Sequence, residues 1–83
     1  MYKRQLNDIV IVLFHIVEEH PFVDSTVENA SNRLKGTMPL IFRESEEGVQ
    51  SIVTSADTMI VEGDTVAMIL KQEYLSLADE ING

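Results

Sequence analysis

Apolar residues in this chain fall into short runs, most of them rich in Ile and Val, separated by polar turns. The first run, Ile9–Val17, is followed by Glu18-Glu19-His20-Pro21. Proline lacks a backbone donor and keeps the preceding residue out of the helical region, so the run ends there. Three later runs have the length and β-branched content of strands: Met38–Arg43, Val49–Thr54 and Val66–Leu70.

A helix is predicted between the first two strands, from about Thr26 to Lys35. Its apolar positions Val27, Ala30 and Leu34 recur at helical spacing, which predicts one buried face. Ser25 stands three residues before Glu28, the spacing of a capping box. At the other end, Gly36 follows the last helical residue, where glycine favours termination.

The chain closes with a second predicted helix, Gln72–Glu80, which turns either Leu75 and Ala78 or Tyr74 and Leu77 inward. The order of elements is β-α-β-β-β-α. It predicts an α+β (α/β) fold with a small mixed β-sheet of about four strands and two short helices.

The first five residues, Met-Tyr-Lys-Arg-Gln, read as the translation of ATG-TAT-AAG-AGA-CAG, which resembles the end of a common sequencing adapter. We therefore expect 1–5 to be an artefact or disordered, and 6–81 to form one domain. The natural polypeptide is then expected to extend upstream of Leu6, so that the chain is a C-terminal fragment of a longer protein.

Composition narrows the function. The chain has 83 residues, enough for one small domain with a thin core, and such folds often gain stability by pairing. It has no cysteine, which excludes disulfides, thiolate catalysis and cysteine zinc sites. A net charge of −8 repels phosphate backbones and anionic lipid, so nucleic acid is not an expected partner. No apolar run reaches the roughly 20 residues of a membrane span, so no direct membrane insertion is expected.

No catalytic or metal-binding pattern stands out, and we expect the protein not to be an enzyme. His15 and His20 match no metal-ligand spacing and are expected to be packed or on the surface. The carboxylates Glu44, Glu46 and Glu47, and those of Glu62 and Asp64, are expected in solvated turns. Met38, Met59 and Met68 are expected to fill the core.

Arg43 is the basic residue in the middle of the sheet region, and two roles are open to it. It could meet a phosphate or a carboxylate of a partner chain, or it could pair with Glu44 or Glu47 on the surface.

The ordered set of motifs resembles the C-terminal regulatory domain of the TrkA type, also called the RCK C-terminal domain. The resemblance spans about Val10 to Leu77. The segments that carry it are Ile11–Val17, His20-Pro21-Phe22-Val23, Asp24–Ala30, Ile41-Phe42-Arg43, Asp57-Thr58, Ile60–Asp64 and Val66–Ile69.

Two positions depart from the family pattern. Asp24 stands where the family usually has glycine before the helix, and Thr54 stands where it usually has proline. Some family members bind cyclic di-AMP between two such domains through an Arg, an Asn and that Pro. The corresponding places here are Ser31 or Arg33, Thr37 and Thr54, so this motif is not carried over. The candidate ligand-binding residues are Arg33, Thr37, Arg43 and Thr54.

The resemblance implies a cytoplasmic regulatory domain of a potassium uptake or other ion transport system. It would pair as a homodimer, associate with a membrane ion channel or transporter subunit at the inner face of the membrane, and sense a small ligand such as a nucleotide or cation. No cofactor is identified. Two alternatives are the cytoplasmic domain of an antiporter or anion transporter, and a stand-alone adaptor of the β-grasp type. In a β-grasp fold, mixed strands surround a helix.

Overall fold

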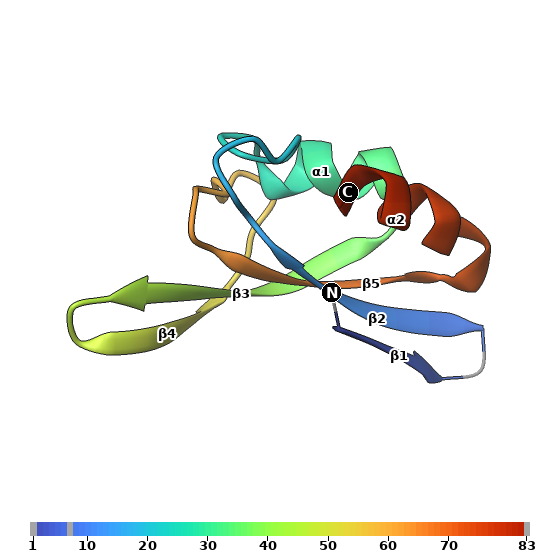
Figure 1. The fold of residues 1–83 in the computed structure, drawn as a ribbon, viewed down its shortest axis with the longest axis horizontal. Helices are drawn as coiled ribbons and strands as arrows, with labels where there is room; N and C mark the ends of the chain where they lie inside the picture. The colour runs from blue at the N-terminus through green and yellow to red at the C-terminus, as the bar shows by residue number, and fades with distance from the viewer. Residues whose placement is uncertain (1, 7, 83) are drawn as a thin grey trace.

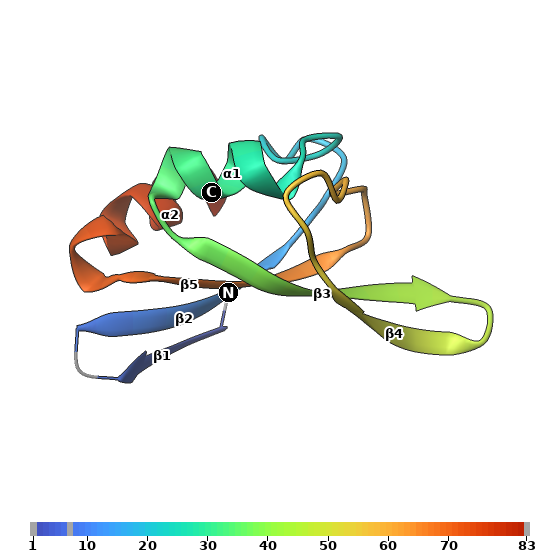
Figure 2. The same ribbon diagram turned by 180° about the vertical axis from the view of Figure 1, so that it is seen from behind.

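A five-stranded sheet carries both helices on one of its faces, as Figures 1 and 2 show from two sides. The computed structural model describes residues 2–6 and 8–82. The elements in chain order are β1 (Tyr2–Leu6), β2 (Ile9–His15), α1 (Val27–Leu34), β3 (Thr37–Ser45), β4 (Gly48–Val53), β5 (Thr65–Lys71), the 3-10 turn η1 (Gln72–Tyr74) and α2 (Leu75–Asn82).

The predicted α+β class and the order of its elements are confirmed. The strands lie in the order β1-β2-β5-β3-β4, and each described pairing is antiparallel rather than mixed. The described pairings are all antiparallel because of the position of β5. The crossover through α1 leaves β2 and β3 parallel to each other, but β5 lies between them and runs against both.

Strand β1 consists of residues that the sequence analysis left out of the fold. It pairs with β2 at one edge of the sheet, with Leu6 opposite Ile9 and Tyr2 opposite Leu13. The backbone of residues 2–6 is extended in this structure. The pairing does not bear on whether these residues are foreign to the natural protein, and that expectation stays a prediction.

The core lies between the helices and one face of the sheet. Alternate residues of β2 and β5 point into it, as the period of two requires. The predicted apolar face of α1 is buried. Of the two alternatives for α2, the one with Leu75 and Ala78 facing inward agrees better with the structure, because Leu77 is 39% exposed. Buried apolar residues are Val10, Val12, Phe14, Ile16, Phe22, Val27, Ala30, Leu34, Met38, Ile41, Ile60, Val66, Met68, Leu70 and Ala78.

Two expectations about the core and the strands need correction. Met59 does not fill the core with Met38 and Met68, because it is 45% exposed in the loop before β5. The first strand stops at His15, two residues short of the prediction. Within the described residues, no helix is long and apolar enough to cross a membrane.

The N-terminus of α1 is capped one residue later than predicted. The hydroxyl of Thr26 accepts a hydrogen bond from the Asn29 backbone at 3.2 Å, so Thr26 is the cap. The capping box between Ser25 and Glu28 does not form. The Glu28 backbone instead donates to the carbonyl of Ala56 at 3.0 Å, which ties the helix to the loop after β4.

The C-terminus of α1 also differs from the prediction, because Lys35 and not Gly36 has the left-handed conformation, with φ of 53°. Gly36 is needed for another reason. A Cβ atom there would lie 2.6 Å from the carbonyl oxygen of Ile69, 3.0 Å from Met68 and 3.1 Å from Leu70. The start of β3 therefore approaches the β5 backbone more closely than any side chain would allow.

Lys35→Gly is expected to raise the free energy of unfolding. A left-handed residue with a Cβ atom costs roughly 1–2 kcal/mol, and glycine removes that cost at the expense of a more flexible unfolded chain, for a net gain of about 0.5–1 kcal/mol. Urea denaturation measures the change. Lys35→Ala is the control, because it also removes the ammonium group 5.7 Å from the Tyr74 ring but keeps the strained backbone. Equal stability of the two variants would contradict the explanation.

Gly36→Ala is expected to have the opposite effect. Its added methyl group meets backbone rather than a movable side chain, so β3 and β5 must separate, at a cost of about 1–3 kcal/mol. The same denaturation experiment measures it. An unchanged midpoint would show that the two strands have room to spare at this point.

Candidate functional site

A partly buried ion pair joins β3 to the turn before β5. The two carboxylate oxygens of Asp64 accept hydrogen bonds from Nε and Nη2 of Arg43, each at 2.9 Å, so the contact is bidentate. Asp64 is fully buried, while the Arg43 side chain keeps 35% of its surface exposed. The backbone of Val61 donates a further bond to Asp64 Oδ2 at 3.0 Å. A buried carboxylate requires such partners, because burying an unpaired charge is costly.

The segment around Asp64 also holds two other parts of the chain. The Asp64 carbonyl accepts a bond from the Ile16 backbone at 2.8 Å, at the end of β2. The Met59 carbonyl accepts from Arg43 Nη2 at 3.0 Å. Ile60 exchanges backbone hydrogen bonds with the entry to α1, donating to Ser25 and accepting from Asp24 at 2.8 and 2.7 Å. The ion pair therefore fixes the point where β2, β3 and the start of α1 meet.

This geometry corrects two expectations. Asp64 does not lie in a solvated turn, and Arg43 pairs with neither Glu44 nor Glu47, because its guanidinium is turned toward Asp64. The hydrogen bond to Asp64 raises the pKa of Arg43, burial lowers it, and the nearby negative charge raises it again. A raised pKa in the folded state means that this stabilisation is present at neutral pH and is lost only in strongly alkaline solution.

A shallow groove of about 360 Å³ lies where α1, the start of β3 and the loop after β4 meet. Its lining is mainly small and uncharged, with Glu28 as its only ionisable side chain. The residues that line it are Val27, Glu28, Ser31, Asn32, Gly36, Thr37, Met38, Pro39, Thr54, Ser55 and Ala56.

Four of the residues that line this groove carry a hydroxyl group: Ser31, Thr37, Thr54 and Ser55. Ser31 comes from α1, Thr37 from the first position of β3, and Thr54 from the residue after β4. Thr54 is held in place, because its hydroxyl donates to the Met38 carbonyl and its backbone donates to the Pro39 carbonyl at 3.2 Å. The hydroxyl oxygen of Ser31 is buried and has no hydrogen-bond partner in the described structure. Such an unpaired buried group calls for an explanation, and a bound ligand would supply one.

The four predicted ligand-binding residues therefore separate into two groups. Thr37 and Thr54 both line the groove. Arg33 does not line the groove, and its guanidinium carbon lies 5.5 Å from the centre of the Phe22 ring. The guanidinium of Arg43 is paired with the Asp64 carboxylate, and Arg43 does not line the groove.

The histidines are placed as packing and surface residues. His20 is buried beside Phe14 and Phe22, with its Nδ1 accepting from the Phe22 backbone at 3.1 Å. His15 is exposed at the end of β2, with Nδ1 3.5 Å from the Thr65 hydroxyl. Over residues 2–6 and 8–82, no cluster of three or more His, Asp or Glu side chains is arranged to hold a metal ion.

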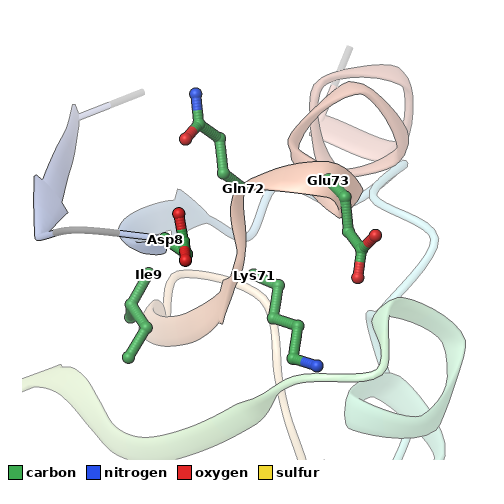
Figure 3. A pocket seen from close by; sticks show the side chains of 5 residues that line it. All are labelled: Asp8, Ile9, Lys71, Gln72 and Glu73. Carbon is green, nitrogen blue, oxygen red and sulfur yellow. The ribbon is translucent and has the colours of Figure 1, made fainter.

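A larger hollow, of about 570 Å³, lies where the turn before β2 meets the end of β5. Figure 3 shows its five lining side chains, with Gln72 pointing away from Lys71 and Glu73. The backbone of Gln72 donates to the Asp8 carbonyl at 2.8 Å and closes this corner. Size alone does not make a binding site, and these side chains do not converge on a common point. We therefore take the smaller groove as the candidate site.

The roles of two residues in the site region, Asp64 and Ser31, were not predicted from the sequence. Asp64 reads as an ordinary turn residue in a Gly-Asp pair, and no local pattern distinguishes a buried aspartate from a solvated one. A usable signal existed in Arg43, because an arginine inside a strand pattern requires an acidic partner when it is partly buried. The unpaired hydroxyl of Ser31 had no signal in the sequence.

Removal of either partner of the ion pair is expected to destabilise the fold unequally. Arg43→Met leaves the fully buried Asp64 carboxylate unpaired and should cost about 3–5 kcal/mol. Asp64→Asn leaves a guanidinium that still reaches water, so the loss should be smaller, about 2 kcal/mol. Urea denaturation measures both, and Glu62→Gln, an exposed change in the same turn, should stay within about 0.5 kcal/mol. A loss for Arg43→Met below that for Asp64→Asn would refute this account of the pair.

Comparisons with known proteins do not assign a family. No family model matches the chain, and no curated protein matches it. The resemblance to the TrkA C-terminal domain therefore stays a prediction, which rests on the motifs quoted above and on the order of the elements.

Proposed function

We propose that this chain is a regulatory domain of a potassium uptake system or another ion transport system, which binds a small ligand in the groove and pairs with a second copy. Ligand binding would favour one arrangement of the paired domains over another. A ligand shifts such an equilibrium only by its difference in affinity for the two arrangements, and that difference would bias an attached channel or transporter. The pair would lie in the cytoplasm, at the inner face of the membrane.

The observation that carries the proposal is the groove with its unpaired Ser31 hydroxyl beside Thr37 and Thr54. The volume of about 360 Å³ is at the small end of the range for ligand pockets. Hydroxyl groups both donate and accept hydrogen bonds, so they suit a polar ligand such as a nucleotide.

The composition of the groove supports binding rather than catalysis. Glu28 is the only carboxylate in its lining, and no histidine, cysteine or lysine is part of it. A general acid-base pair or an activated nucleophile needs such groups within hydrogen-bonding reach.

The alternatives differ in what the domain is attached to. An antiporter or anion transporter with the same cytoplasmic domain would use the groove and the pairing in the same way. The stand-alone β-grasp alternative is not favoured, because it calls for mixed strands and the described pairings are antiparallel.

Ser31→Ala provides a test with two effects of opposite sign. Removing an unpaired buried hydroxyl should leave the unliganded protein as stable as before or more stable, by up to about 1 kcal/mol. It should also weaken ligand binding about tenfold, which corresponds to about 1.4 kcal/mol. Isothermal titration calorimetry with cyclic di-AMP, ATP and potassium chloride as probes measures the affinity, and Ser76→Ala, an exposed change on α2, is the matched control.

The calorimetry has three possible results, and each bears differently on the proposal. Binding of one probe that Ser31→Ala weakens and Ser76→Ala does not would support the groove as the sensing site. If none of the three probes binds at millimolar concentration, the ligand-sensing proposal is wrong. Binding that is unchanged in Ser31→Ala would place the ligand elsewhere.

A further inference from the structure

The face of the sheet opposite the helices is apolar across four strands. In Figures 1 and 2 both helices lie on the same side, and no described element covers the other. The cross-strand register places alternate residues of each strand on this face, which we call the open face. Its apolar residues are Ile9, Ile11 and Leu13 on β2, Ala67 and Ile69 on β5, Leu40 and Phe42 on β3, and Val49 and Val53 on β4.

The exposure of these side chains is high for a sheet face. Val53 is 82% exposed, Val49 66% and Ile9 45%, and the remaining six are partly exposed. Soluble monomeric proteins rarely expose a contiguous apolar patch that spans several strands. Such a patch usually marks a surface that binds another molecule. Among the described side chains of β2, β3, β4 and β5, the ionisable ones on this face stand at the strand ends, namely His15, Glu44 and Lys71, and none lies at the centre of the patch.

Charged residues of opposite sign stand at the two ends of the open face. Lys71 ends β5, and its partner across the sheet is Ile9. Glu44 is near the end of β3, opposite Val49. Thr37 pairs with Ile69 and Phe42 with Thr65, so Lys71 and Glu44 lie beyond opposite ends of the β3–β5 pairing. Both side chains are exposed, and neither forms an ion pair with another described residue.

This arrangement is self-complementary under one symmetry. Sheets that pack face to face lie about 10 Å apart. A two-fold axis between the sheets and perpendicular to the strands reverses the strand direction, so Lys71 of one copy meets Glu44 of the other at both ends. An axis parallel to the strands would instead bring like charges together. Closed two-fold pairs of this kind are the commonest assemblies of identical chains.

We propose that two copies of this chain pack open face on open face, with the two-fold axis perpendicular to the strands. This inference rests on the pairing in the proposed function and names the surface that makes it. Four strands about 4.8 Å apart and about seven residues long give a flat footprint of roughly 450 Å². That is smaller than the about 800 Å² per partner of a standard interface, so the pair should be weak, with a Kd on the order of micromolar.

Sedimentation equilibrium of the intact chain and its variants tests the surface. Val53→Glu places a carboxylate on the apolar open face, at its most exposed apolar residue, and should raise the dimer Kd at least tenfold. The exposed position of Val53 means that folding does not depend on it, which circular dichroism checks. Leu77→Glu is the control, because Leu77 is also exposed but lies on α2, in the helical layer.

Charge exchange tests the symmetry. Lys71→Glu and Glu44→Lys should each weaken the dimer several-fold, and the double variant should restore it, because the two charges meet across the pair. Glu80→Lys, an exposed change on α2, is the control and should not restore pairing in Lys71→Glu.

Each result has a definite meaning. A wild-type chain that stays monomeric up to about 200 µM overturns the pairing itself, while probe binding at the groove reports on the sensing function separately. A dimer that Val53→Glu leaves intact overturns the open face as the interface. Single charge variants that weaken the dimer without rescue in the double variant overturn the proposed axis.

Discussion

The fold depends on the bidentate contact between Arg43 and Asp64. A fully buried carboxylate is tolerable only when its hydrogen-bonding capacity is used, and here two guanidinium nitrogens and the Val61 backbone use it. The turn that supplies Asp64 also bonds to the end of β2 and to the entry of α1. One ion pair thus sets the relative positions of β2, β3 and α1.

The groove follows from that junction. The 56–58 loop accepts the first backbone donors of α1, and Thr54 bonds to the carbonyls of Met38 and Pro39. These hydrogen bonds therefore fix the distance between α1 and β3, the two elements between which the groove lies. At the far end of α1, the contact between Gly36 and the Ile69 carbonyl brings the start of β3 against β5. Ser31 lines this groove, and its hydroxyl oxygen is buried without a hydrogen-bond partner among the described residues.

The two surfaces proposed here have different chemistry and lie on different sides of the molecule. The groove is polar, small and formed at the helical layer, while the open face is broad and apolar and lies on the other side of the sheet. Pairing through the open face would leave both grooves accessible. The groove and the pair could then be coupled through β3, which contributes Thr37 to one surface and Leu40 and Phe42 to the other.

The sequence by itself determined the types and order of the elements from β2 to α2, and the buried face of α1. Those features follow from local periodicities of two and 3.6 residues, which tertiary contacts rarely overturn in strongly patterned segments. Of the four candidate ligand-binding residues, Thr37 and Thr54 line one groove, while Arg33 and Arg43 lie outside it. Only the tertiary structure decided that β5 lies between β2 and β3, that Arg43 pairs with an aspartate 21 residues away, and that Lys35 takes the left-handed position. Each of these depends on which distant segments meet, and that is set by the joint packing of the whole sheet, not by any local run of residues.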